Sequence, residues 1–533
     1  MKTAVTKDRG GPRTVSAVAV LACAWPALVL ATVCLLPYLN KPFNIDDPWF
    51  LTMAQQIVKH PAHPMDFTEC WNVAPDCAKA YFWASGNPLM GQVAQGYVLV
   101  PTVLDGAHER MAHVTQLVLV WIAVVAMTSL IFRFGWGRRH AIAGALLLVA
   151  VPPFLPMAST AMPDILATAL ALVAMERLVA WKAEGKWSQG AAAAVALGLA
   201  GFARSHLALL LPLAAFFLLE SINPREILAQ IRRKLWLWAP VLAGFGVLLA
   251  MILSLRERNL AINPTPAVAE GRLTTLNLLS YLLYFAFPLP LAACWLANRL
   301  KNRRLGIVIV LFVVAVVPWF LRWNQTFALA WFFAVIGCGV LVNLFFVALK
   351  TREHTGLFLA LWLLIPLPII HYAHLPIKYL LPCMPAVILL CFWLTEGFSV
   401  RVARAAAIVL IVASTGYSLL ILHSDAEFAD FGRDALYGLI KPHVAAGERV
   451  WFPEQYWSYW YAPLAGATLT FPGGPQPKPG DLLVVNLFTE GEHPTLARFP
   501  HRTLVDAISH KYRFGRTMGA GIGLYSNWYG FWL

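Results

Sequence analysis

Long apolar runs alternate with short polar segments over the first four-fifths of the chain. A membrane-spanning helix needs about 20 mostly apolar residues, and the runs that approach this length predict about thirteen transmembrane helices. They lie at residues 15–39, 114–132, 140–156, 163–181, 190–203, 205–220, 235–254, 276–297, 305–321, 327–349, 356–373, 376–396 and 402–422. A further apolar stretch, 93–104, is too short to span upright and predicts a helix at the membrane interface.

Positive charge marks every second polar connection. The N-terminus carries Lys2, Lys7, Arg9 and Arg13. The other basic connections are 133–139, 182–186, 225–234, 299–304, 350–352 and 401–404. Cytoplasmic connections carry an excess of Lys and Arg. The N-terminus is therefore expected in the cytoplasm, and thirteen spans place the tail after residue 422 outside.

Composition supports a membrane protein. Of the 533 residues, 59% are apolar and 13% charged, whereas soluble chains carry about 25% charged residues. This excludes an ordinary soluble enzyme, a disordered chain and a coiled coil. The net charge of +14, from 41 basic and 27 acidic residues, follows from the basic cytoplasmic connections, so nucleic acid is not an expected partner.

Two external segments are long enough to carry structure. One is the loop 40–113, and the other is the tail 423–533. In the tail, a helical pattern at 427–440 precedes three β-rich runs with a Pro/Gly connector at 472–480. The runs are 449–452, 467–471 and 481–488. This pattern predicts two domains: a transmembrane domain, 1–422, and a small C-terminal α/β domain, 423–533.

An acidic pair, Asp46 and Asp47, follows the first span and precedes Pro48. The apolar positions 49, 50, 53, 57 and 58 then have helical spacing, which predicts a helix lying in the membrane surface. Asp before Pro is a favoured helix start, so Asp47 is expected to cap this helix. Asp46 has no such role, and a carboxylate at a membrane surface is costly unless it is solvated or used.

Four further polar residues lie at predicted span ends. Asp164 opens the fourth span, where an acid also suits the helix dipole. Arg204 lies at an external turn, and Lys378 and Tyr379 begin the twelfth span. A basic residue at a span end commonly reaches to the lipid headgroups, and a basic–aromatic pair is a common interfacial anchor.

Cysteine and histidine pairs leave alternatives open. Cys70 and Cys77 share the first external loop, where an oxidising compartment permits a disulfide. His371 and His374 share a connection with Lys378 and, together with the acidic pair, could hold a divalent metal, although their spacing is not a zinc signature. In the tail, the aromatic cluster at 451–461 is expected to fill a core or to lie at the membrane interface.

Several motifs occur in the order found in one enzyme family. After the acidic pair come NPLMGQVAQGYVLVP (87–101), HERMAHV (108–114), MASTAMPDILATALALVAM (157–175), GFARSHLALLLPL (201–213) and IKYLLPCMPAVILL (377–390). Together they resemble the membrane glycosyltransferases of the GT-C fold, in the branch of the protein O-mannosyltransferases and lipid A aminoarabinose transferases. Two details differ from that pattern: one proline is missing before residue 89, and Arg204 stands where a lysine is common.

The resemblance implies a hexosyltransferase that moves a sugar from a polyprenyl phosphate to a hydroxyl group at the outer face of the inner membrane. The acceptor would be a protein, lipid A or an envelope glycan. The resemblance makes Asp46 the general base, with Asp47 orienting it or capping its helix. Asp164 would position the acceptor or the base. The donor phosphate would meet Arg204, Lys378 and Tyr379.

Two other functions compete with this one. The first is a transporter or flippase for a lipid-linked sugar, and the second is an O-antigen ligase or polymerase with a diphosphate-linked donor. Transporters commonly place ionisable groups at mid-span, whereas here these groups concentrate at one membrane face. A ligase or polymerase would lack the acidic pair after the first span. Both comparisons favour the transferase.

Overall fold

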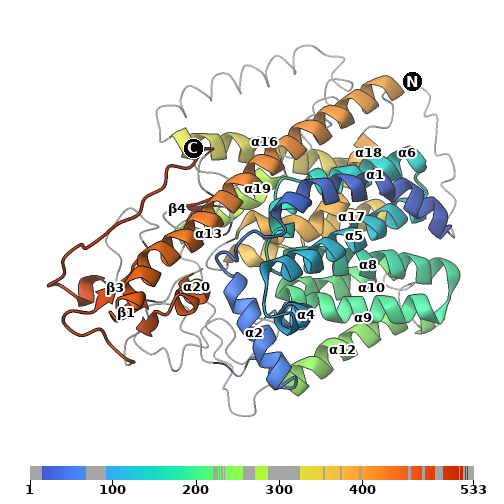
Figure 1. Ribbon diagram of the computed structural model, residues 1–533. Helices are drawn as coiled ribbons and strands as arrows, with labels where there is room; N and C mark the ends of the chain where they lie inside the picture. Colours follow the sequence, from blue (N-terminus) through green and yellow to red (C-terminus); the bar gives the residue numbers. More distant parts are fainter. Residues whose placement is uncertain are drawn as a thin grey trace.

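A computed structural model gives the fold, and most of the chain between residues 15 and 525 is described. The described residues are 15–65, 67, 92–219, 226, 229, 232, 235–255, 271–285, 325–351, 354–371, 375–394, 399–453, 458–470, 474–486, 496–514, 517–519, 522–523 and 525. Apolar helices form a bundle, and the long helix α19 leads from its side to the C-terminal strands (Figure 1).

Helices occupy the predicted apolar runs. They are α1 (Ala17–Leu35), α5 (Glu109–Arg133), α6 (Arg138–Ala150), α8 (Asp164–Glu184), α9 (Trp187–Ala203), α10 (Leu210–Leu218), α12 (Ala239–Leu255), α13 (Gly271–Tyr284), α16 (Gln325–Thr351), α17 (His354–Leu363), α18 (Met384–Leu394) and α19 (Val400–Ala445). Among the described residues, three stretches are long and apolar enough to cross a membrane: Ala17–Tyr38, Glu109–Arg133 and Val400–Ala445. The other apolar helices are shorter, and the predicted span 305–321 lies outside the described residues. A count of thirteen spans stays a prediction.

Small residues allow close helix packing in the bundle. A Cβ atom on Gly198 of α9 would lie 2.6 Å from Cγ1 of Val247 in α12. A Cβ atom on Gly244 of α12 would lie 3.0 Å from the carbonyl oxygen of Ala194 in α9. Membrane helices associate through such small residues because apolar burial alone does not drive them together in lipid. This contact fixes α9, whose last residue precedes Arg204.

The predicted surface helices are present beside the bundle. Helix α2 (Asp47–Lys59) packs against α3 (Val93–Val98) and α4 (Val100–Leu104). It buries its apolar stripe there, including Phe50, Met53 and Ile57. Gly96 permits the contact, since a Cβ atom at this position would lie 2.7 Å from Cγ of Met53. The predicted helix at 93–104 forms as two short pieces rather than one.

The last apolar helix and the first tail helix are one element. Helix α19 has 46 residues, whereas the sequence predicted a span ending at 422 and a separate helix at 427–440. No glycine or proline interrupts the chain between these stretches, so helix propagation continues through the polar residues. The predicted domain boundary after residue 422 therefore falls within a helix, and the division into two domains stays a prediction.

Short strands follow α19. Strand β1 (Val450–Pro453) pairs in parallel with β2 (Thr468–Thr470) and β3 (Leu482–Leu483), in the order β2-β1-β3. Helix α20 (Ser458–Leu464) lies between β1 and β2 in the chain. Further on, β4 (Met518–Gly519) and β5 (Ile522–Gly523) form an antiparallel pair. Each of the three β-rich runs of the tail thus contains a strand. Strand β1 is as long as its predicted run, whereas β2 and β3 are shorter than theirs.

Candidate functional site

The polar turn 159–164 between α7 (Phe154–Ala158) and α8 gathers the candidate residues. The Ala161 amide donates to Oδ1 of Asp47 at 2.8 Å, and the Ala161 carbonyl accepts from Gln95 at 2.7 Å. The Sδ atom of Met162 lies 3.1 Å from Nζ of Lys378. Residues from the first external loop, α3 and the start of the twelfth apolar run therefore meet at one turn.

Asp46 forms an ion pair with Lys378. Lys378 lies in the 3-10 helix η6 (Ile377–Cys383), and its Nζ is 3.3 Å from Oδ2 of Asp46. The Lys378 side chain is 1% exposed, whereas that of Asp46 is 35% exposed. An ammonium ion buried this deeply needs an anionic partner. The pair therefore combines a buried cation with a carboxylate that reaches solvent.

Asp47 is fully buried and holds the loop that carries Asp46. Its Oδ2 accepts the amide of Asn44 at 2.8 Å, and its Oδ1 accepts the amide of Ala161. Burial raises the pKa of Asp47 to about 7, although Lys41 and the two amides oppose this shift. The predicted cap was wrong by one residue: Asp46 occupies the N-cap position without a side-chain capping bond, and Asp47 is the first helical residue. Asp47 instead accepts hydrogen bonds from the amides of Asn44 and Ala161, which lie outside this helix.

Arg204 and Asp164 form a buried pair at the same end of the bundle. Nη2 of Arg204 lies 2.7 and 2.8 Å from the two carboxylate oxygens of Asp164. Asp164 is the first residue of α8, and Arg204 directly follows the last residue of α9. The two consecutive helices pack against each other, which brings the start of α8 beside the end of α9 and aligns the two charges. Asp164 thus fixes a cation, a role that its place in the sequence did not suggest.

Tyr379 stands between the two cations. The guanidinium carbon of Arg204 lies 4.1 Å from the centroid of the Tyr379 ring, and Nζ of Lys378 lies 5.8 Å from it. The cations attract the ring face. Asp46, Asp164, Arg204, Lys378 and Tyr379, which the sequence placed in distant segments, therefore lie together. The arrangement offers an accessible carboxylate beside two cations that could meet an anionic ligand.

Two residues near this site, His206 and Tyr525, were not anticipated. His206 stacks on Tyr379 with ring centroids 6.3 Å apart. Among the described residues, the buried Nε2 of His206 and Nε of Arg204 have no hydrogen-bond partner. Tyr525 places its ring 5.1 Å from Nζ of Lys378. His206 was within a quoted motif, but its sequence neighbours gave no sign of its role.

Several predicted residues lie outside the described part of the chain. These are Cys70, Cys77, His374 and the side chain of His371. The described side chains contain no group of three or more His, Cys, Asp or Glu residues placed to hold a metal ion. In the aromatic segment of the tail, Tyr461 is buried, and its hydroxyl accepts the Phe43 amide at 2.7 Å and donates to Glu109 at 2.9 Å. The tail therefore touches the loop that carries the acidic pair.

Comparisons with known proteins give structural likeness but no family. No family model and no curated protein matches the chain. Among solved structures, ArnT from Cupriavidus metallidurans in the apo state is 15% identical, with a TM-score of 0.40 and 86% of each chain covered. The same protein bound to undecaprenyl phosphate is 13% identical, with a TM-score of 0.39 and the same coverage.

The arabinosyltransferase EmbB from Mycobacterium smegmatis is 16% identical, with a TM-score of 0.36, and the match covers 84% of this chain and 44% of EmbB. ArnT is a lipid A aminoarabinose transferase, and both proteins are membrane glycosyltransferases of the GT-C fold. Identities and TM-scores of this size do not establish an activity, which has to be argued from the residues of the site.

Proposed function

We propose that this protein is a membrane glycosyltransferase that moves a sugar from a polyprenyl phosphate to a hydroxyl acceptor at the outer face of the inner membrane. One observation supports this most directly. Asp46 keeps a solvent-accessible carboxylate 3.3 Å from the buried ammonium of Lys378, and Lys378 shares the Tyr379 ring with Arg204. A base and a pair of cations are the two elements that this reaction needs.

Asp46 acts as the general base. The acceptor oxygen attacks the anomeric carbon of the donor sugar, the bond from that carbon to the phosphate oxygen breaks, and the acceptor proton passes to the Asp46 carboxylate. Such proton transfer contributes about 10²–10⁴-fold to a rate. Asp47 is too deeply buried to receive this proton from a bound acceptor, since its side chain is fully covered and both of its oxygens accept amides.

Lys378 and Arg204 stabilise the leaving group, a polyprenyl monophosphate. Negative charge develops on its bridging oxygen as the bond breaks, and fixed cations lower the energy of that charge most where water is excluded. Lys378 is paired with Asp46 in the resting protein. An arriving phosphate therefore competes for the lysine, and Asp46 is left with weaker pairing and a free lone pair for the acceptor. Asp164 keeps Arg204 in place.

The test compares the full-length protein with its Asp46→Asn variant in lipid nanodiscs supplied with a total membrane extract, which contains the lipid-linked donor together with lipid, glycan and protein acceptors. Mass spectrometry follows the lipid-linked sugars and the polyprenyl monophosphate that is released. The wild type should release the monophosphate, and Asp46→Asn should do so at least 100-fold more slowly while still retaining the donor. Asp105→Asn is the matched control because Asp105 is an exposed acid of the same external region.

Each alternative outcome would assign a different role to Asp46 or a different function to the protein. Release at the wild-type rate by Asp46→Asn would remove Asp46 as the base. A co-purifying diphosphate-linked oligosaccharide would place the protein with the O-antigen ligases or polymerases. Movement of an intact lipid-linked sugar between leaflets, without release of a monophosphate, would make it a transporter.

A further inference from the structure

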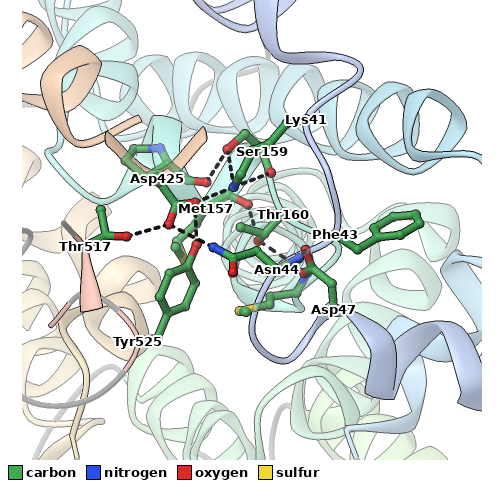
Figure 2. A network of polar contacts seen from close by, with 12 residues as sticks. Lys41, Phe43, Asn44, Asp47, Met157, Ser159, Thr160, Asp425, Thr517 and Tyr525 are labelled. Carbon is green, nitrogen blue, oxygen red and sulfur yellow. Dashed lines mark hydrogen bonds and ion pairs between the residues drawn. The ribbon is translucent and has the colours of Figure 1, made fainter. Parts of the chain in front are cut away.

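A buried polar network connects the acidic loop with two distant parts of the chain (Figure 2). Its centre is Asp425 of α19, which is fully buried. The carboxylate accepts Nζ of Lys41, Nδ2 of Asn44 at 3.2 Å, the hydroxyl of Thr517 at 2.9 Å and the hydroxyl of Tyr525 at 2.5 Å. Four donors from the first external loop and the C-terminal segment therefore meet at one charge.

The loop is anchored at several successive positions. Lys41 also donates to the carbonyl and the hydroxyl of Ser159, at 3.0 and 3.2 Å. Its own carbonyl accepts a ring nitrogen of His113 at 2.8 Å. Asn44 reaches Asp425 with its side chain and Asp47 with its amide. Asp46 lies between Asn44 and Asp47, so the positions of these two residues determine where its carboxylate lies.

Tyr525 joins this network to the candidate site. Its hydroxyl donates to Asp425, and its ring lies 5.1 Å from Nζ of Lys378, the ion-pair partner of Asp46. Burial and the neighbouring Asp425 raise the pKa of the Tyr525 hydroxyl well above its usual range, so it stays a donor at every physiological pH. One tyrosine near the end of the chain thus contacts both the anchor of the loop and the predicted phosphate ligand.

We propose that Asp425 and Tyr525 are positioning residues, which hold Asp46 in its working place when the C-terminal segment is docked. The catalytic part of this inference rests on the proposed function, whereas the anchoring of the loop does not. Replacing either residue should free the loop without removing a group that contacts substrate at the reacting atoms. The C-terminal segment then serves as a structural support of the active site.

The hydroxyl and the ring of Tyr525 can be tested separately. Tyr525→Phe removes the hydroxyl and keeps the ring beside Lys378, whereas Tyr525→Leu removes both. Asp425→Asn keeps the shape at the centre of the network but removes its charge. Tyr512→Phe is the control because Tyr512 also packs on α19, against Phe428 and Phe431, but is not among the donors to Asp425.

Three measurements are made on the full-length variants in nanodiscs. Amide hydrogen exchange reports the order of residues 41–47. Titration with undecaprenyl monophosphate gives the affinity of the phosphate site, and release of monophosphate from a total membrane extract, with its lipid, glycan and protein acceptors, gives the turnover rate. Loss of one hydrogen bond to a charged group changes such an equilibrium by about 10–100-fold.

Tyr525→Phe should therefore speed exchange at 41–47 and slow turnover by about tenfold or more, while affinity for undecaprenyl monophosphate stays within about twofold of wild type. Tyr525→Leu should in addition weaken that affinity, because the ring no longer attracts the Lys378 ammonium. Asp425→Asn should behave like Tyr525→Phe with a larger effect on exchange. Exchange in α5 and α8 should not change in any of the variants.

Wild-type exchange at 41–47 in both Tyr525→Phe and Asp425→Asn would overturn the inference. Exchange that rises throughout the bundle, with turnover and affinity falling together, would also overturn it and leave these residues a general stabilising role. If the loop is freed as expected but the wild type releases no monophosphate, then the positioning is correct and the proposed function is wrong. If the loop is freed but turnover stays at the wild-type rate, the position of the loop does not control catalysis. Only the catalytic part of the inference is then rejected.

Discussion

The buried pair of Arg204 and Asp164 allows stability and ligand binding to be separated by mutation. Nη2 of Arg204 contacts both carboxylate oxygens of Asp164, and the side chains are 5% and 1% exposed. We expect Asp164→Leu and Arg204→Met each to destabilise the protein strongly. The double variant should recover most of this loss because it leaves no buried charge without a partner.

The structure sets the size of the effect. Two unit charges about 4 Å apart attract by about 4 kcal/mol at the effective dielectric constant of a protein. Removing one member of a buried pair costs about 3–5 kcal/mol, since the other charge stays desolvated, whereas apolar replacement of both is often close to neutral. The partly exposed pair of Arg433 and Asp430, at 3.3 Å, is the control, with Asp430 as the residue replaced because Arg433 also pairs with Asp434. Its removal should cost about 0–1 kcal/mol.

The assay measures the apparent unfolding temperature from tryptophan fluorescence and the affinity for undecaprenyl monophosphate by native mass spectrometry. In the double variant the unfolding temperature should return by more than half of the single-variant loss, while affinity for the monophosphate stays low. A double variant whose loss equals the sum of the single losses would refute the idea of a coupled pair. A double variant that binds the monophosphate like wild type would remove Arg204 from the phosphate site.

Two further predictions concern Asp47 and the external cysteines. The pKa of Asp47 in the folded protein, about 7, lies above its ordinary value of 3.8, so its stabilising contribution is full below pH 3.8 and is lost as the pH rises through 7. The unfolding temperature of the wild type should therefore fall between about pH 4 and pH 7, and Asp47→Asn should flatten this slope; an unchanged slope would contradict the assignment. If Cys70 and Cys77 form the predicted disulfide, a non-reducing peptide map should show them linked, whereas alkylation of both would reject it.

The helices of the bundle were largely predictable because an apolar run of sufficient length has few other stable forms in a membrane. The ends of elements were less predictable. The sequence separated α19 into a span and a tail helix, since residues 423–426 are polar, but polarity alone does not stop helix propagation. The one-residue error at Asp47 has a similar cause: its carboxylate bonds to Ala161, which is 114 residues away, and no local pattern reports that contact.

The residues of the site were predicted from the sequence, but the ion pairs that they form were not. Motif order and the resemblance to a known family brought Asp46, Asp164, Arg204, Lys378 and Tyr379 into one list. They did not show that Arg204 pairs with Asp164 or that Lys378 pairs with Asp46. These partners are 40 and 332 residues apart in the chain. A single sequence contains no direct signal for such contacts, so each charge on its own was compatible with an interfacial anchor.

The contact between Lys41 and Asp425 could have been anticipated from the general rule that buried charges are paired. Each follows a predicted span, at residue 39 and residue 422, and each looked like an ordinary polar residue at a membrane surface. Both are buried, and a buried charge persists where it finds an opposite charge. Helices α1 and α19 both pack against α6 and α7, so the segment that follows α1 and the polar middle of α19 are brought together, where a lysine and an aspartate can neutralise each other. The pair ties the start of the acidic loop to α19, 384 residues away in the chain, and for that reason we expect the position of Asp46 to depend on it.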